Sequence, residues 1–186
     1  MNRRAIALVH YPVLDGQGEI VTTAVTNLDV HDLARSAKTF GCTDYFITHP
    51  IEAQRALVER IRAHWLEGSS GRRIPDRRAA LQVLRIASSI DEVLETLGGR
   101  KEVDVWATTA RTARPTLSFE AARGRLLQSG DRSLLIVFGT GWGLAPKVIE
   151  SADVLLEPIR AKTGDYNHLS VRSACAIALD RLFGAP

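Results

Sequence analysis

Cysteine is scarce in this chain, which has only Cys42 and Cys175 among its 186 residues. Two cysteines so far apart lack the short spacing of a metal-binding cluster and are too few for a disulfide framework. We therefore expect free thiols, no metal site and a reducing, cytoplasmic environment. Long apolar runs are also missing, since no segment approaches the roughly 18 residues that a membrane-spanning helix needs. The segment Met1 to His10 lacks a small-residue cleavage site and predicts a first strand instead of a signal peptide.

Charge of one sign is not in large excess either. The formal net charge is +3, which permits a nucleic-acid partner without requiring one. A hydrophobic content of 45% in 186 residues is enough for one well-buried domain and excludes global disorder. We expect a single domain over residues 1–186.

Short β-branched runs alternate along the chain with longer segments of helical apolar spacing. Strands are predicted at residues 5–10, 44–48, 81–87, 103–108, 133–138 and 154–156. Helices are predicted at residues 28–40, 51–67, 90–97, 118–128 and 169–183, the first capped by Thr26 or Asn27 and ended by Gly41. This alternation predicts an α/β fold, in which helices cover both faces of a parallel sheet.

One segment, GSSGRRIPDRR at residues 68–78, has the composition of a flexible insertion. Arg72, Arg73, Arg77 and Arg78 make it strongly basic. Two interpretations remain open for it, a solvated surface loop and an RNA-binding patch. The second has a physical basis, because guanidinium groups pair with phosphate oxygens through two parallel hydrogen bonds.

The run LLIVFGTGWGLAPK, residues 134–147, is the most informative part of the sequence. A buried-type strand leads directly into glycines at alternate positions, Gly139, Gly141 and Gly143. Glycines at such a place let the backbone turn sharply and approach a ligand closely. A tight turn that binds nothing is the alternative.

Two common nucleotide-binding motifs do not fit this run. A P-loop needs a glycine before its lysine and a hydroxyl residue after it, but Pro146 precedes Lys147 and Val148 follows. A dinucleotide fingerprint, GxGxxG, fails because the sixth position is Leu144 when counted from the first glycine and Pro146 when counted from the second. These mismatches argue against a Rossmann-type nicotinamide oxidoreductase.

Three segments together resemble the SPOUT superfamily of S-adenosylmethionine (SAM)-dependent RNA methyltransferases. They are TNLDVHDLARSAKTFGCTDYFI at 26–47, LIVFGTGWGL at 135–144 and LLEPIRAKTGDYNHLSVRSACAIALDRL at 155–182. The closest likeness is to a small bacterial branch of unassigned RNA substrate. Its signatures HYPVLDxxGEIVTTAVTNLDVHD and DYNHLSVRS are found here at 10–32 and 165–173.

The resemblance implies a SAM-dependent enzyme that methylates tRNA or rRNA, works as a homodimer and has a carboxyl-terminal trefoil knot. Small residues in the predicted helix 169–183 suit close packing in a knot or against a second subunit, although an ordinary buried helix has the same composition. A SAM-binding accessory module without turnover is the alternative function.

The resemblance also implies roles for individual residues. Those expected to line the SAM pocket are Phe138, Gly139, Thr140, Gly141, Gly143, Leu156, Pro158, Ile159, Asn167, His168, Leu169 and Ser170. Arg35 corresponds to an arginine that faces the target nucleotide, and Asp165 corresponds to an acidic turn residue that is a candidate base. Each has a plainer interpretation, as a surface arginine and a turn aspartate. The ribose-methylating branch has an asparagine where this chain has Ser170, which weakens the case for 2′-O specificity.

Overall fold

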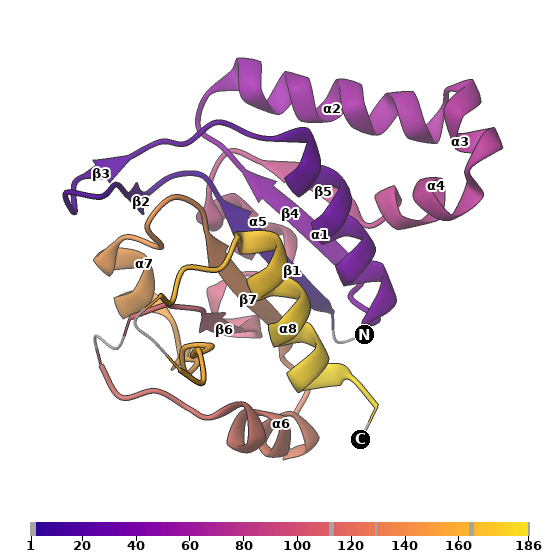
Figure 1. The fold of residues 1–186 in the computed structure, drawn as a ribbon. Helices are drawn as coiled ribbons and strands as arrows, with labels where there is room; N and C mark the ends of the chain where they lie inside the picture. Colours follow the sequence, from indigo (N-terminus) through magenta and orange to yellow (C-terminus); the bar gives the residue numbers. More distant parts are fainter. Residues whose placement is uncertain (1–2, 112–113, 129, 164–165, 186) are drawn as a thin grey trace.

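The computed structural model describes residues 3–111, 114–128, 130–163 and 166–185 (Figure 1). Its elements follow one another in the order β1 (Arg4–Val9), β2 (Val13–Leu14), β3 (Ile20–Val21), α1 (Asn27–Thr39), β4 (Asp44–Thr48), α2 (Glu52–Leu66), α3 (Ser69–Arg73), α4 (Pro75–Leu81), β5 (Leu84–Ala87), α5 (Ile90–Thr96), η1 (Arg100–Glu102), β6 (Val103–Ala107), α6 (Phe119–Gln128), β7 (Ser133–Gly139), α7 (Pro146–Ser151), β8 (Val154–Leu155) and α8 (Val171–Phe183). Every predicted strand and helix is present in the structure, most within two residues of the predicted ends.

The main sheet has six strands in the order β5-β4-β1-β7-β6-β8. Each neighbouring pair runs parallel. The α/β class and the parallel sheet are therefore confirmed. Strands β2 and β3 form a separate antiparallel pair that projects beside α7 (Figure 1).

Both faces of the sheet are buried, which explains why its strands are almost continuously apolar. In β1, Ile6 and Leu8 belong to one core cluster, whereas Ala5 and Ala7 belong to the other. The first cluster is covered by α1, α2, α4, α6 and α8, and the second by α5 and α7. Helices on both faces, as predicted, result from this two-sided burial.

Segment 68–78 differs from our expectation of a flexible loop, because most of it forms the helices α3 and α4. Pro75 occupies the first turn of α4, where its missing N–H removes no helical hydrogen bond. Ala80 and Leu81, beyond the basic stretch, pack into the core beside α1. This tertiary contact orders a segment whose glycine and serine content suggested flexibility. Because α4 extends to Leu81, the next strand begins at Leu84 and not at the predicted residue 81.

The β2–β3 pair, η1 and α7 were also not predicted. The β2–β3 pair is only two residues long on each side, too short for a periodic signal. Helix α7 starts at Pro146, again in the first turn, and has six residues.

Cys42 and Cys175 are free thiols buried in the same core cluster.

Candidate functional site

The carboxyl ends of the neighbouring strands β7 and β6 open into a cavity of about 1080 Å³. This is the edge at which open parallel α/β sheets usually bind ligands. Its walls come from several parts of the chain: the approach to α1 (residues 23–29, in part), the segment after β6 (108–111), the glycine loop (138–143) and the lead into α8 with its first turns (166–178, in part). Phe119 of α6 and the segment after β8, with Glu157 and Ile159, complete them. Segments far apart in sequence therefore meet at one site.

The glycine loop doubles back so tightly that it has no room for a side chain at Gly139 or Gly141. A Cβ on Gly139 would lie 2.6 Å from the Leu144 nitrogen, and one on Gly141 would lie 2.8 Å from the Leu14 carbonyl oxygen. Gly141 also has a φ of +59°, which disfavours other residues. Trp142 N–H donates to the Leu14 carbonyl, which fixes the loop against β2. The loop consequently presents its main chain to the cavity.

A chain of hydrogen bonds supports the floor of the cavity. The Thr140 hydroxyl donates to the Val9 carbonyl at 3.1 Å, so it accepts from the Thr23 hydroxyl. Thr23 in turn accepts from His10 Nδ1 at 3.0 Å. Within the described structure His10 Nε2 is buried without a partner. Burial and the nearby His49 ring lower the pKa of His10 to about 4, so the ring is neutral at pH 7.

We expect acid to destabilise the protein through this histidine. Because the folded pKa of His10 lies below its unfolded value, the unfolded chain binds more protons between about pH 4 and 6.5, and stability falls as pH falls through that window. At pH 5 this effect of His10 lowers the free energy of unfolding by about 2 kcal/mol relative to pH 7.5. Urea unfolding across this range should show stability falling with pH, and His10→Gln should reduce this dependence. Burial also lowers the pKa of His31 and His49, so a smaller dependence of the same sign should remain. His64→Gln, which changes an exposed ring on α2, should leave the parent's pH dependence intact, and a parent dependence of zero would contradict the prediction.

The wall between α1 and α8 is charged. Asp29 is almost fully buried in the first turn of α1, where its side chain accepts from the Thr26 hydroxyl at 2.6 Å. Arg172 of α8 donates to the other Asp29 oxygen at 2.9 Å and lies 3.6 Å from Asp32. This pairing ties the two helix starts together at the cavity and keeps the Asp29 charge compensated.

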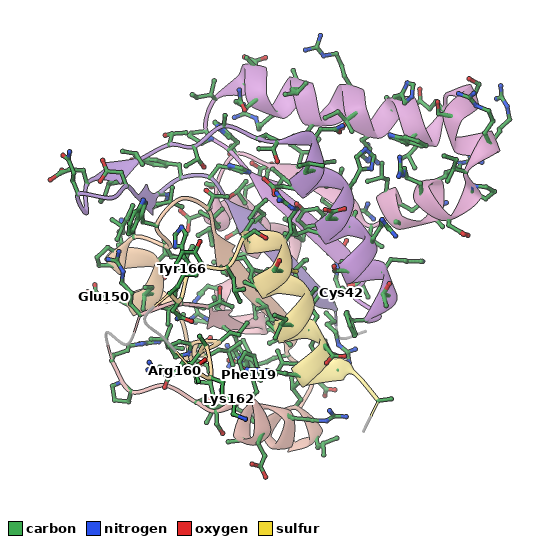
Figure 2. All side chains as sticks on the ribbon, in the orientation of Figure 1. Cys42, Phe119, Glu150, Arg160, Lys162 and Tyr166 are labelled. Carbon is green, nitrogen blue, oxygen red and sulfur yellow. The ribbon has the colours of Figure 1, made fainter. Side chains whose placement is uncertain are left out.

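The opposite wall is formed where the segment after β6 runs beside the segment after β8, paired in parallel at Leu117 and Leu156. Leu117 N–H donates to the Leu155 carbonyl, and Glu157 N–H donates to the Leu117 carbonyl. The Asn167 amide donates to the Ala110 carbonyl at 3.4 Å. Figure 2 labels Tyr166 on the segment that leads into α8.

The structure brings most of the expected cofactor-binding residues together around this cavity. Lining it are Phe138, Gly139, Thr140, Gly141, Gly143, Ile159, Asn167, His168, Leu169 and Ser170. Leu156 and Pro158 are buried next to it and are not among its lining residues. Leu156 packs in the core cluster below α8.

Of the two candidate catalytic residues, Arg35 and Asp165, the structure describes only Arg35. Arg35 is exposed and lies outside the main cavity, in a shallower groove of about 500 Å³ between α1 and α8. Ser170 and Arg172 line both hollows, so the groove adjoins the cavity. Arg35 makes no hydrogen bond or ion pair to any residue that the structure describes. Asp165 lies outside the described residues.

The four arginines of segment 68–78 lie apart from the cavity. Figure 1 shows α3 and α4 at the far end of α2, across α1 from α7 and the glycine loop. Arg72, Arg73 and Arg78 are exposed, and the Arg77 guanidinium lies 4.7 Å from the centre of the Trp65 ring. They form a separate basic surface, which we call the α3–α4 basic patch.

Several lining residues were missed by the sequence analysis, among them Thr23, Asp29, Arg111, Trp142 and Arg172. For most of these no local signal existed, because a threonine or arginine in a connecting segment has no distinctive pattern. Trp142 did carry a signal, since a large aromatic residue between two glycines has no packing role within the turn itself.

The described residues contain no cluster of three or more His, Cys, Asp or Glu side chains placed to hold a metal ion. Likewise, none of the helices in the described ranges combines the length and apolar character of a membrane span.

Comparison with known proteins gives consistent results. A family model described as SAM-dependent RNA methyltransferase matches residues 3–184. An uncharacterised protein of Aquifex aeolicus is 43% identical over 181 residues, covering 96% of this chain and 87% of that protein. A tRNA (guanine-N(1)-)-methyltransferase of Oleidesulfovibrio alaskensis is 44% identical over 180 residues. The match covers 96% of this chain and 41% of the relative, so the chain spans about two fifths of that relative's length.

Among solved structures, the SpoU methyltransferase AviRb from Streptomyces viridochromogenes, in complex with the cofactor AdoMet (SAM), is similar with a TM-score of 0.59. The alignment covers 98% of this chain and 57% of AviRb at 11% identity. Identity this low shows a shared fold and nothing finer.

Proposed function

Because the chain belongs to the SPOUT superfamily of SAM-dependent RNA methyltransferases, we propose that it methylates a nucleotide of tRNA. The observation that carries this proposal is the cavity at the carboxyl ends of β7 and β6, where the tight turn at Gly139 and Gly141 meets charged residues of α1 and α8. Its volume of about 1080 Å³ is above the roughly 300–1,000 Å³ of ordinary small-molecule sites. A cofactor and a nucleotide therefore have room together.

The residues present fit SAM. The ligand carries an adenine and a ribose, whose edges pair with main-chain donors and acceptors, and the turn at Gly139 and Gly141 has main chain where a Cβ would collide. We propose that the ten lining residues named above hold SAM, with Leu156 and Pro158 supporting them from below. When bound, SAM supplies a methyl group already activated by its sulfonium.

The protein's own task is then alignment and proton removal. The acceptor atom of the nucleotide must be held in line with the methyl group, an arrangement that accounts for much of the rate in such transfers. We propose that Arg35 and Arg172, on either side of the boundary between groove and cavity, hold the RNA for this purpose. Asp165 is the proposed base that takes the proton of the acceptor.

The guanine N1 position is not part of this proposal. The tRNA (guanine-N(1)-)-methyltransferase name describes a whole relative, more than half of which lies outside the match to this chain. We adopt tRNA as the substrate class from that relative and leave the methylated atom to experiment.

We also propose that the chain is a single domain closed by a trefoil knot and that it acts as a cytoplasmic homodimer. The support for the knot is that the Leu117 hydrogen bonds bring the segment after β6 directly beside the carboxyl-terminal segment after β8. The exposed Arg35 in a groove open to solvent supports a dimer in which a second subunit completes the site. Light scattering of the purified protein tests the dimer, and a monomer at all concentrations would refute it.

The α3–α4 basic patch is proposed to bind the RNA backbone away from the catalytic site. Replacing Arg72 and Arg73 with Gln should weaken tRNA binding and lower the slope of log affinity against log salt by about 1 to 2, because each phosphate contact contributes roughly 0.7–0.9. Filter-binding titrations at several salt concentrations measure this slope. Arg60→Gln, an exposed arginine of α2, is the control and should change neither quantity. An unchanged slope in the double variant would exclude the patch from the interface.

The proposed function is tested by incubating the protein with tritiated SAM and separated tRNA and rRNA fractions from a strain lacking it, followed by nucleoside mass spectrometry. We expect label in tRNA. Label only in rRNA would correct the substrate class. SAM binding with no label in any RNA would favour an accessory module, and thermal stabilisation by NAD instead of SAM would favour an oxidoreductase.

A further inference from the structure

Trp142 lines the mouth of the cavity with its side chain half exposed. The residue is 49% exposed, whereas Trp106 is fully buried in the core. An indole is among the largest apolar surfaces that a side chain can bury, and leaving half of it in water forgoes that stabilisation. It stands between Gly141 and Gly143, in a turn that excludes side chains at Gly139 and Gly141.

One face of this indole is already backed by the protein. A Cβ on Gly16 would lie 3.3–3.4 Å from three adjoining indole atoms, Cε2, Cζ2 and Nε1. Cε2 is a ring-fusion atom, and the near-equal distances to it and to two of the three atoms bonded to it place Gly16 over the ring face, close to the N–H edge of the indole. Hydrogen bonds of 2.9 Å join Leu14 to the main chain of Trp142 and Gly143 on either side. The ring orientation is thus set before any ligand arrives, which lowers the entropic cost of binding.

The remaining contacts of the indole come from other walls of the cavity. His168 lies with its ring centre 5.3 Å away at a tilt of 43°, and the Arg111 guanidinium carbon lies 5.5 Å from the indole centre. Among the described residues His168 is the only aromatic ring in contact with Trp142, and at this tilt it does not lie flat on it. A flat group entering from solvent would meet the indole between an imidazole and a cation.

We propose that Trp142 is the stacking platform for the unpaired base of the acceptor nucleotide, with Arg111 and His168 closing on that base from the cavity side. The inference rests on the proposed function and names how its substrate is recognised. An unpaired base offers a flat π-face, and its attached phosphate offers a negative charge for Arg111. The indole stands at the rim, which a nucleotide reaches from solvent, whereas a small cofactor is held with most of its surface buried.

The test uses Trp65→Phe as the parent, so that Trp142 supplies the exposed tryptophan fluorescence while Trp106 stays buried. Bulk bacterial tRNA should quench this fluorescence. In the same background Trp142→Ala should weaken tRNA binding about 30-fold, because stacking is worth roughly this much per base. SAM affinity, measured by calorimetry, should stay within about twofold of the parent.

Two further variants separate stacking from loss of structure. Trp142→Phe keeps a smaller π-face and should recover most of the tRNA affinity. Gly16→Val leaves Trp142 in the sequence but presses on its ring, so it should weaken tRNA binding and spare SAM. A tRNA affinity unchanged by Trp142→Ala overturns the inference, as does an equal loss of SAM affinity, which would place the indole in the cofactor site.

These binding measurements need no turnover, so the inference about Trp142 and the proposed function can be refuted independently. If tRNA binds through Trp142 but receives no methyl group from SAM, the methyl-transfer proposal fails and the platform stands. If the parent protein methylates RNA but its tRNA binding does not involve Trp142, the platform fails and the function stands. No tRNA binding by the parent overturns the platform.

Discussion

Replacing Gly139 with alanine should weaken SAM binding by about 100-fold or more. The added Cβ would lie 2.6 Å from the Leu144 nitrogen and 2.9 Å from the Gly143 carbonyl carbon, both main-chain atoms that move only if the whole loop moves. Moving the loop displaces the main-chain groups proposed to hold the cofactor. The steric strain should also cost about 1–3 kcal/mol of folding stability. Calorimetry with SAM and urea unfolding measure the two effects separately.

The matched control is Gly124→Ala in α6, where a Cβ would meet no atom within 4 Å. This variant should bind SAM normally and gain up to about 1 kcal/mol of stability, because alanine favours a helix more than glycine does. If Gly139→Ala is folded and binds SAM as tightly as the parent, the glycine loop is not the cofactor cradle, and the proposed site loses its central element.

Replacing Arg35 with alanine should reduce methyl transfer to tRNA by about 100-fold or more while SAM affinity stays within about twofold. The arginine lies in the groove beside the cavity, lined in common by Ser170 and Arg172, and away from the glycine loop. It is exposed, so its loss removes a contact to RNA without opening the core. Losses of this size are usual when a group that positions the reacting atoms is removed. Single-turnover transfer and calorimetry give the two readouts.

Lys38→Ala is the control, since it removes an exposed cation from the same helix that does not line the groove. It should change transfer by less than about threefold. Arg35→Lys keeps the charge but loses the planar fork, and we expect partial activity from it. Equal losses of SAM binding and transfer in Arg35→Ala would show that its role is in the cofactor site, contrary to our proposal.

The chain's local patterns predicted most of the fold. Continuous apolar runs such as residues 133–138 indicated strands buried on both faces, and these are central strands of a parallel sheet. The start of α1 was also predictable, because a hydroxyl side chain directly before a helix accepts from a free N–H two or three residues further on, as Thr26 does from Asp29. Segment 68–78 was misjudged, since its local composition gives no sign that the residues beyond it pack beside α1.

The candidate site also has one part that the sequence predicts and another that depends on the tertiary structure. The sequence by itself determined that a tight glycine turn follows β7, because only glycine tolerates the close approach made at Gly139. Tertiary structure alone decided which distant residues join it. Asp29 with Arg172, Thr23 with His10, and Trp142 with Gly16 are 13 to 143 positions apart, and no local pattern pairs them. Their meeting depends on strand order and on where α8 crosses α1, which arise from burying both faces of one sheet.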